Sequence, residues 1–478
     1  MESKPFPYQD TFSLYRRLSA DGENVSLLLE SRSLDLRYGK ESAVVPNPIL
    51  KISGKNNDFR IEALTLNGES ILQRLDLSSG KHIQITKKEK RLVTGRLDPD
   101  EMGQNLTEEE RISGHAISSF LRLIGKQIGV SHPYFGLYGA VAYDFARHYY
   151  AFGNRFSSDP GEDYIFFLPA EVYAFNDIEK TAMHHLFFPD NEPCHGFTFQ
   201  KNPAKESLDI EDAQYLQRAG KIIKEIKNGR AMQCVFSRQA SHPLQIHPLI
   251  SYQKLREINP APYSFYFSLG NNEVLYGASP ELHIKIKDRE IEIRPIAGTM
   301  KRSENPLEDS EARIKLLTDE KEKREHTMLV DLARSELCSL CEDGSVAVSD
   351  LFTLEHYPNL YHMVSGVKGK LRPDRDAFDA LLITLPAGTL SGAPKLEAMK
   401  MIEENEASRR GFYGGIIGYF SFGGDCNTGI TIRSIHVKNG MSMIRSGGGI
   451  VALSSPKGEL SESKLKMAKM LEVVGAEQ

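Results

Sequence analysis

Three apolar runs lie close together near the end of the chain: Phe-Tyr-Gly-Gly-Ile-Ile-Gly-Tyr-Phe-Ser-Phe at 412–422, Gly-Ile-Thr-Ile-Arg-Ser-Ile-His-Val at 429–437, and Met-Ser-Met-Ile-Arg-Ser-Gly-Gly-Gly-Ile-Val at 441–451. Each run is rich in β-branched, aromatic or other apolar residues, which predicts a strand. Only short turns separate the runs, whereas a parallel pair would need a crossover of a dozen or more residues. The runs therefore predict successive antiparallel strands.

The rest of the chain extends this pattern. Residues 1–200 are predicted to form short strands with turns, including 25–30 and 59–66, a helix at 115–127 and a buried strand at 136–144. A polar, proline-containing stretch at 190–207 is the expected linker, and a helix follows at 210–228. Helices and strands then alternate irregularly. We predict an α+β fold of large antiparallel sheets packed as a sandwich with helices outside, divided into domains at 1–200 and 208–478.

Composition limits the classes of function. The 478 residues carry a net charge of −5 and are 40% hydrophobic, as is ordinary for a globular enzyme. No basic block or membrane-length apolar run is present, so neither nucleic acid nor a membrane is an expected partner. The N-terminal segment has no secretory apolar region. The five cysteines are scattered and favour a cytoplasmic location, and the pair Cys338 and Cys341 is predicted to be two buried small side chains.

A second informative segment is Leu-Pro-Ala-Gly-Thr-Leu-Ser-Gly-Ala-Pro-Lys at 385–395, followed by a helical run at 396–404. Glycine allows backbone amides and hydroxyls such as that of Thr389 to approach a ligand closely. The spacing of a P-loop is absent. From the residues alone, a ligand-binding loop and a buried turn both remain open.

Two pairs of carboxylates have helical spacing. Glu322 and Glu325 lie on a predicted helix over 318–334, where Glu325 shares a face with apolar residues. Glu459 and Glu462 open the last helix, and Lys466 follows one turn after Glu462. Such pairs commonly form a solvated helix face, but two of them also suit a hard cation such as Mg²⁺ with an anionic substrate.

Candidate anion-binding groups occur in the same part of the chain. Arg433 ends an apolar run, and the three glycines at 447–449 could present backbone amides to an anion. A surface ion pair and a tight turn are the plain alternatives. His362, in an apolar context, is either a core histidine or a general acid or base.

These segments together resemble the chorismate-utilising enzymes, and within them the large subunit (component I) of anthranilate synthases. The resemblance covers 214–469, and residues 25–165 resemble the N-terminal domain of that subunit. The matching motifs lie at 294–299 (Arg-Pro-Ile-Ala-Gly-Thr), 325–334, 362–365 (His-Met-Val-Ser), 385–395, 413–420 and 430–433 (Ile-Thr-Ile-Arg). Their order and spacing make the resemblance specific.

The resemblance implies a role for each matching residue. Glu325 and Glu462 would hold Mg²⁺, with Glu322 and Glu459 beside them. His362 would protonate the departing C4 hydroxyl, and Thr389 would line the pocket. The carboxylates of chorismate would be bound by Gly298, Thr299, Tyr413, Arg433, Gly447, Gly448, Gly449 and Lys466. The implied reaction adds ammonia at C2 and then eliminates pyruvate to give anthranilate, the first step of tryptophan biosynthesis.

Two positions discriminate among related enzymes. Family members that attack with water carry a lysine where this chain has Gln233, and an amide cannot act as a base. Aminodeoxychorismate synthases carry a nucleophilic lysine where this chain has Ala297. Both signs favour either anthranilate synthesis or an enzyme that stops at 2-amino-2-deoxyisochorismate, and the sequence separates these two poorly. A catalytically silent binding paralogue is the other alternative.

The resemblance also implies partners. No glutamine amidotransferase segment is found in the chain, so a separate amidotransferase subunit would supply ammonia. Tryptophan is the expected feedback inhibitor, bound by Glu30, Ser31, Pro262, Tyr263 and Ser264. Ser264 and Ala261 depart from the family pattern, and Ser264 removes an apolar contact, so weaker binding is expected. The alternative for 27–29 is a plain core strand.

Overall fold

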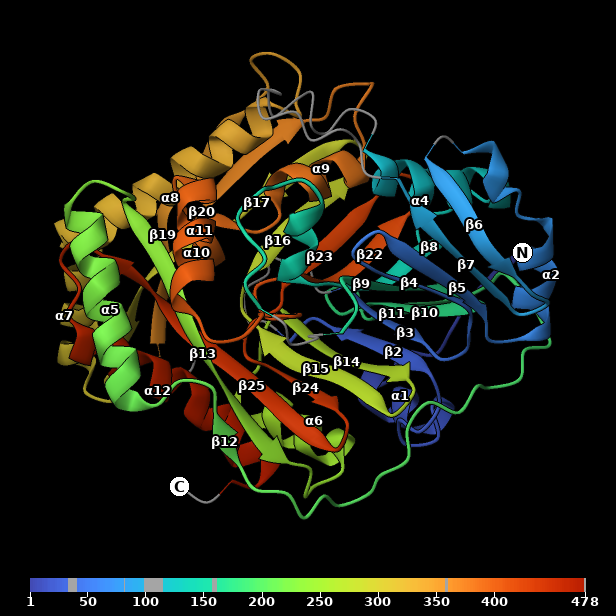
Figure 1. Ribbon diagram of the computed structural model, residues 1–478, viewed down its shortest axis with the longest axis horizontal. Helices are drawn as coiled ribbons and strands as arrows, with labels where there is room; N and C mark the ends of the chain where they lie inside the picture. Colours follow the sequence, from blue (N-terminus) through green and yellow to red (C-terminus); the bar gives the residue numbers. More distant parts are fainter. Residues whose placement is uncertain (33–40, 81, 99–114, 157–160, 357–359, 477–478) are drawn as a thin grey trace.

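The computed structural model describes residues 1–32, 41–80, 82–98, 115–156, 161–356 and 360–476. Within these ranges the strands form two large sheets in which neighbouring strands are antiparallel (Figure 1). Helices lie outside the sheets, so the predicted α+β class is confirmed.

The first sheet has twelve strands within the described ranges. Its order is β1 (Glu2–Pro5), β11 (Thr181–Leu186), β10 (Glu171–Asn176), β3 (Glu41–Val45), β2 (Ser26–Glu30), β14 (Tyr263–Gly270), β15 (Glu273–Ser279), β24 (Ser434–Lys438), β25 (Met441–Val451), β13 (Gln233–Pro243) and β12 (Ser207–Leu208), with β21 (Gly392–Ala393) paired to β13.

The second sheet has thirteen strands among the same residues. Its order is β18 (Ile296–Lys301), β20 (Leu360–Lys370), β17 (Glu290–Ile293), β16 (Leu282–Lys287), β23 (Cys426–Ile430), β22 (Ile416–Ser421), β8 (Gly136–Val141), β9 (Tyr164–Pro169), β4 (Pro48–Lys55), β5 (Asp58–Ala63), β7 (Leu92–Leu97) and β6 (Ile83–Lys88), with β19 (Ala347–His356) paired to β20. Strands from both sides of residue 200 pair directly, as β2 with β14 and β8 with β22. The division at 200–208 stays a prediction.

Several helices lie at two opposite sides of the molecule. Figure 1 shows α5, α7, α8, α11 and α12 on the left and α2 and α4 on the right. Their bounds are α1 (Thr11–Leu18), α2 (Leu66–Arg74), α4 (Ala116–Ile128), α5 (Asp212–Lys227), α6 (Pro248–Ile258), α7 (Pro306–Thr318), α8 (Glu320–Cys338), α9 (Ala377–Thr384), α10 (Gly388–Ser391), α11 (Lys395–Asn405) and α12 (Pro456–Val474), with short 3₁₀ turns η2 (Leu77–Ser79) and η3 (Tyr143–His148). None of the helices in the described ranges combines the length and apolar character needed to cross a membrane.

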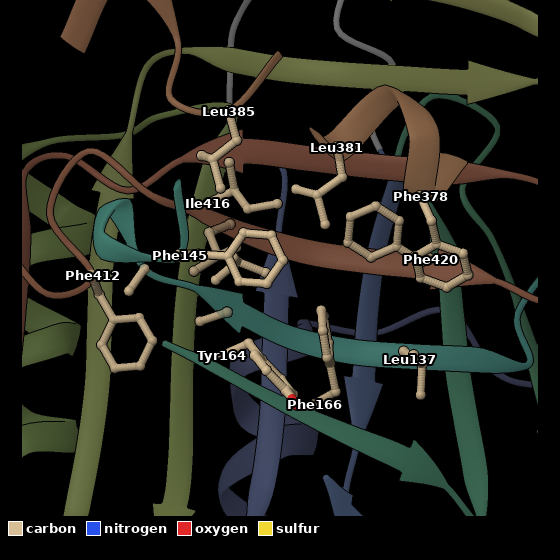
Figure 2. Packing of buried hydrophobic residues seen from close by; sticks show 14 of the residues in the cluster. Leu137, Phe145, Tyr164, Phe166, Phe378, Leu381, Leu385, Phe412, Ile416 and Phe420 are labelled. Carbon is tan, nitrogen blue, oxygen red and sulfur yellow. The ribbon is translucent and has the colours of Figure 1, made fainter. Parts of the chain in front are cut away.

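One core cluster joins the two sheets. It includes Phe265 of the first sheet and Phe166 of the second. Figure 2 shows how α9 closes this core: Phe378 stacks on Phe420 of β22, with ring centroids 5.5 Å apart. Burial of each such ring stabilises the fold by roughly 1.5–3 kcal/mol. The sheets are thereby held face to face, and the segments between them have fixed positions.

The prediction of one continuous strand at 429–437 is wrong. The run 429–437 is divided between the sheets, because β23 ends at Ile430 and β24 begins at Ser434. Between them the amide of Thr431 donates to the carbonyl of Gly415 at 2.8 Å, and Arg433 has a positive φ of 49°. Side-chain preference cannot reveal this crossing, since both halves are apolar and β-branched.

Smaller corrections concern element ends. The strand predicted at 59–66 ends at Ala63, because Thr65 caps α2. The strand predicted at 136–144 ends at Val141 and continues as η3. The glycines at 447–449 lie inside β25 and not in a turn. Cys338 is exposed, whereas Cys341 is buried as predicted.

Candidate active site

A pocket lies where the chain crosses between the two sheets. Its walls come from β13, β18, β20, β25, α10, α12, the turn before β22 and the crossing segment 431–433. It is lined by these residues predicted from the sequence: Thr299, His362, Thr389, Tyr413, Arg433, Gly447, Gly448, Gly449 and Lys466. The tertiary structure thus brings together motifs spread over almost 170 positions of the chain, from 299 to 466.

The three glycines of β25 are required by close packing. A Cβ at Gly447 would lie 2.2 Å from the carbonyl oxygen of Phe236 on β13. A Cβ at Gly448 would lie 3.0 Å from Oε2 of Glu459, and one at Gly449 would lie 2.2 Å from Nε2 of Gln233. Glycine at these positions leaves room for the Phe236 carbonyl and for the side chains of Glu459 and Gln233 to approach the strand.

The pocket is rich in positive charge. Arg433, Arg445 and Lys466 line it. Nζ of Lys466 lies 2.6 Å from Oε1 of Glu462 and donates to the carbonyl of Gly447 at 3.2 Å. Such groups suit an anionic ligand with more than one carboxylate.

His362 on β20 lies beside Thr299 on β18, and its Nδ1 is 2.9 Å from the hydroxyl oxygen Oγ1 of Thr299. Burial lowers the pKa of His362 to about 3, and the nearby charges of Arg433 and Lys466 act in the same direction. In the ligand-free protein the imidazole is therefore neutral at physiological pH.

Glu281 was not predicted as a site residue from the sequence. It lines the same pocket and is 5% exposed. Burial raises the pKa of Glu281 to about 7, although the Thr389 hydroxyl, the Ile296 amide and the charges of Lys466 and Arg433 oppose the rise. Its sequence signal is a carboxylate set between two apolar strands, β15 and β16. Arg445 was also missed.

The four predicted metal ligands are not gathered into one cluster. Glu459 and Glu462 both lie near Gly448, Oε1 of Glu325 lies near Gly449, and Glu322 lies near Gly298. Among the residues that the structure describes, no group of three or more His, Cys, Asp or Glu side chains is close enough to hold a metal ion. Carboxylate oxygens are nevertheless the donors that Mg²⁺ prefers, and Glu325, Glu459 and Glu462 face neighbouring residues of one strand. By donor type these carboxylates suit Mg²⁺, whereas the described positions do not place three of them around one point.

Gln233 and Ala297 stand next to this site. Nε2 of Gln233, which is 3% exposed, donates to Oε1 of Glu325 at 3.3 Å. Ala297 is buried, and its carbonyl lies 3.0 Å from Nδ1 of His326. Gly298 beside it has a φ of +92°, which favours glycine.

A second pocket contains all the residues predicted to bind tryptophan. Glu30, Ser31, Pro262, Tyr263 and Ser264 line it, together with Tyr134, Tyr419 and Asn427. The carboxylate of Glu30, however, already accepts hydrogen bonds from Thr11 (2.6 Å), Tyr252 (2.7 Å) and Arg256 (2.9 Å). These donors come from α1 and α6, so the carboxylate anchors β2 to the two helices.

Comparisons with known proteins identify the family of the chain. The model of a family described as chorismate binding enzyme matches residues 76–472. Anthranilate synthase component 1 of Escherichia coli (strain K12) is 33% identical over 97% of this chain and 94% of its own length, and that of Buchnera aphidicola subsp. Diuraphis noxia is 33% identical over 94% and 92%.

Solved structures show the same likeness. Anthranilate synthase component I from Streptococcus pneumoniae TIGR4 superposes with a TM-score of 0.67 at 26% identity, covering 90% of this chain and 92% of that one. The isochorismate synthase MenF from Escherichia coli, at 17% identity and a TM-score of 0.70 over 99% and 94%, shares the fold. The chain therefore belongs to the chorismate binding enzymes, as a relative of anthranilate synthase component 1.

Proposed function

We propose that this chorismate-utilising enzyme converts chorismate and ammonia into anthranilate, pyruvate and water. The observation that carries the proposal is the placement of Gln233, whose side-chain amide donates to the proposed metal ligand Glu325 at 3.3 Å. An amide cannot deprotonate water, whereas ammonia attacks with its own lone pair and needs no base. Ala297 likewise supplies no nucleophile.

The substrate carries two carboxylates, and the pocket has separate means of binding them. Arg433 and Lys466 contribute positive charge, and the glycines of β25 line the pocket beside them. Mg²⁺, held by Glu325 and Glu462 with Glu322 and Glu459 near them, would neutralise the ring carboxylate. Tyr413 and Thr389 would confine the ring between these groups.

We assign the proton for the departing C4 hydroxyl to Glu281. As the C2–N bond forms and the C4–O bond breaks, the leaving oxygen needs a proton. The pKa of Glu281 is raised to about 7 by burial, so a large fraction of this carboxyl is protonated near neutral pH. The pKa of His362 is about 3 because of burial and the charges of Arg433 and Lys466. His362 remains the second candidate, since substrate carboxylates would offset both charges and raise its pKa.

The elimination step then breaks the C3–O bond and removes the proton from C2, which makes the ring aromatic. The enolpyruvate that leaves takes up one proton at its methylene carbon and becomes pyruvate. A separate glutamine amidotransferase is the proposed source of ammonia. The relatives carry the name component 1, which supports a partner subunit. The second pocket is the proposed tryptophan site, supported by the convergence there of five residues predicted from the sequence.

The test is a fluorescence assay of the purified chain with chorismate, Mg²⁺ and ammonium at mildly alkaline pH. Anthranilate is expected, and chelation of Mg²⁺ should abolish it. Chromatography of the same mixture separates the alternatives: accumulation of 2-amino-2-deoxyisochorismate would identify an enzyme that stops halfway. Isochorismate as the product would refute the argument from Gln233. Binding of chorismate without consumption, even with the amidotransferase present, would favour a silent paralogue.

A further inference from the structure

A buried ion pair lies directly behind the active-site pocket. Arg410 and Glu406, at the end of α11 and in the turn that follows, each have a side chain that is 1% exposed. Nη2 of Arg410 donates to Oε1 of Glu406 at 2.6 Å, and Nε donates to Oε2 at 3.0 Å. Arg410 does not line the pocket, so it is not expected to touch the substrate.

The remaining donors of Arg410 reach two walls of the pocket. Nη1 donates to the carbonyl of Leu390 on α10 at 2.5 Å, and Nη2 donates to the carbonyl of Val235 on β13 at 2.8 Å. Both Leu390 and Val235 line the pocket, and Leu390 is the neighbour of Thr389. One guanidinium group therefore links α10 to a strand that is far from it in the sequence.

The same group lies against a third wall. Cζ of Arg410 is 4.5 Å from the ring centroid of Tyr143 and 5.8 Å from that of Tyr413. Tyr413 packs with Leu390 and Ile430 in a small apolar cluster. A cation near an aromatic face is attracted to the ring, and the attraction is stronger where water is excluded.

Glu406 holds the guanidinium in place from behind. Its Oε1 accepts hydrogen bonds from the amide and the hydroxyl of Ser237 on β13, at 2.9 and 2.6 Å. Its Oε2 lies 3.3 Å from Nη1 of Arg445, which lines the pocket. The buried pair is thus tied to β13 and β25 and is not free to rotate.

We propose that Arg410 is a positioning residue that sets the relative places of Tyr413, the Leu390 turn and β13 around the substrate. The planar fork of arginine can satisfy a carboxylate and two carbonyls at once, whereas an ammonium on a flexible stem cannot match that geometry. The identity of the bound substrate, chorismate, rests on the proposed function. The positioning itself rests only on the contacts of Arg410.

The first arm of the test needs no ligand. Hydrogen exchange of the free protein is followed in peptides covering 388–391 and 411–415 for the wild type, Arg410→Lys and the control Arg238→Lys. Arg238 is a matched control because it is also buried, at 3% exposed, it forms an ion pair with Asp212, and its Cζ lies 5.5 Å from the ring centroid of Tyr215. Like Arg410, it does not line the pocket. Arg410→Lys should speed exchange in both peptides at least tenfold, and Arg238→Lys should leave them unchanged. Unchanged exchange in Arg410→Lys would overturn the proposal.

The second arm measures steady-state kinetics. Arg410→Lys should raise the KM for chorismate at least tenfold, with the KM for ammonium changed less than twofold. In a Tyr413→Phe background the effect of Arg410→Lys should shrink, because both changes act on one wall. Fully additive effects, or equal rises in both KM values, would mark Arg410 as merely structural. If the wild type does not consume chorismate, the proposed function fails, and hydrogen exchange alone decides the role of Arg410.

A second variant covers the case in which Arg410→Lys does not fold. Tyr143→Leu removes the ring against which the guanidinium lies. Among the residues that the structure describes, the Tyr143 hydroxyl has no hydrogen-bond partner, so leucine leaves no polar group without its partner. Faster exchange at 411–415 is expected again, and its absence would count against the proposal.

Discussion

Replacement of Glu281 by glutamine should stabilise the protein while it removes activity. The pKa of this carboxyl rises from 4.5 to about 7 because of burial. Below pH 4.5 the side chain is protonated in both the folded and unfolded states. Between pH 4.5 and 7 the unfolded chain loses the proton while the folded protein keeps it, so the stability of the wild type falls as pH rises.

The size of this effect follows from the same values. A difference of about 2.5 pKa units, at about 1.4 kcal/mol each, amounts to about 3.5 kcal/mol of destabilisation at high pH, of which about 3 kcal/mol is present at pH 7–8. Glu281→Gln removes the charge and keeps the shape. We expect its free energy of unfolding to exceed that of the wild type by up to about 3 kcal/mol at pH 8 and to match it at pH 4.5. For a chain of 478 residues this corresponds to about 3 °C in Tm.

The assay is thermal unfolding of both proteins from pH 4.5 to 8, combined with anthranilate formation at a fixed concentration of free ammonia. Loss of a general acid should lower kcat by roughly 10²–10⁴. Glu403→Gln is the matched control: Glu403 is also buried, but its carboxylate lies 2.8 Å from Arg147, so its loss should destabilise the protein and preserve activity. A Glu281→Gln variant that is less stable than the wild type at pH 8, or fully active, would refute the reasoning.

Three further predictions concern the metal ligands, the glycine strand and the second pocket. Glu462→Gln should abolish Mg²⁺-dependent turnover without loss of stability, because the side chain of Glu462 is 48% exposed. The Mg²⁺ dependence of kcat measures the turnover, and Tm measures the stability. Retained turnover would reject the metal assignment. Gly449→Ala should lower kcat/KM at least a hundredfold, because the added Cβ would lie 2.2 Å from Nε2 of Gln233. Gly220→Ala is the control and should leave kcat/KM unchanged, because its added Cβ would lie 3.9 Å from the nearest atom. Tyr263→Ala should weaken tryptophan binding at least tenfold in calorimetry, and unchanged binding would exclude this pocket.

Much of the fold could be predicted from local patterns. The helices at 210–228 and near 115–127 were expected from apolar spacing, and the structure places them at Asp212–Lys227 and Ala116–Ile128. The antiparallel class followed from short turns between strands. The division of 429–437 between two sheets did not, because the change of sheet depends on backbone hydrogen bonds from the Gly414 amide to the Thr431 carbonyl and from the Thr431 amide to the Gly415 carbonyl, and not on side-chain type.

Site residues with distinctive side-chain chemistry were predicted from the sequence. Residues whose role depends on their surroundings in the folded protein were missed. His362, Arg433 and Lys466 were found from their motifs, and they share one pocket. Glu281 was missed because a carboxylate gains a raised pKa only when the fold removes water from it. Arg410 was missed for a related reason, since an arginine reveals its role only through the carbonyls it reaches.

The sequence by itself determined the strand and helix types, the antiparallel class and the motifs that mark the family, because these depend on side-chain chemistry and spacing along the chain. The tertiary structure decided that both sheets take strands from either side of residue 200. It also decided that Glu30 anchors β2 to α1 and α6 and that Glu281 faces the pocket. Burial, charge and hydrogen bonding act between atoms close in space, and no local pattern specifies which distant segments become neighbours.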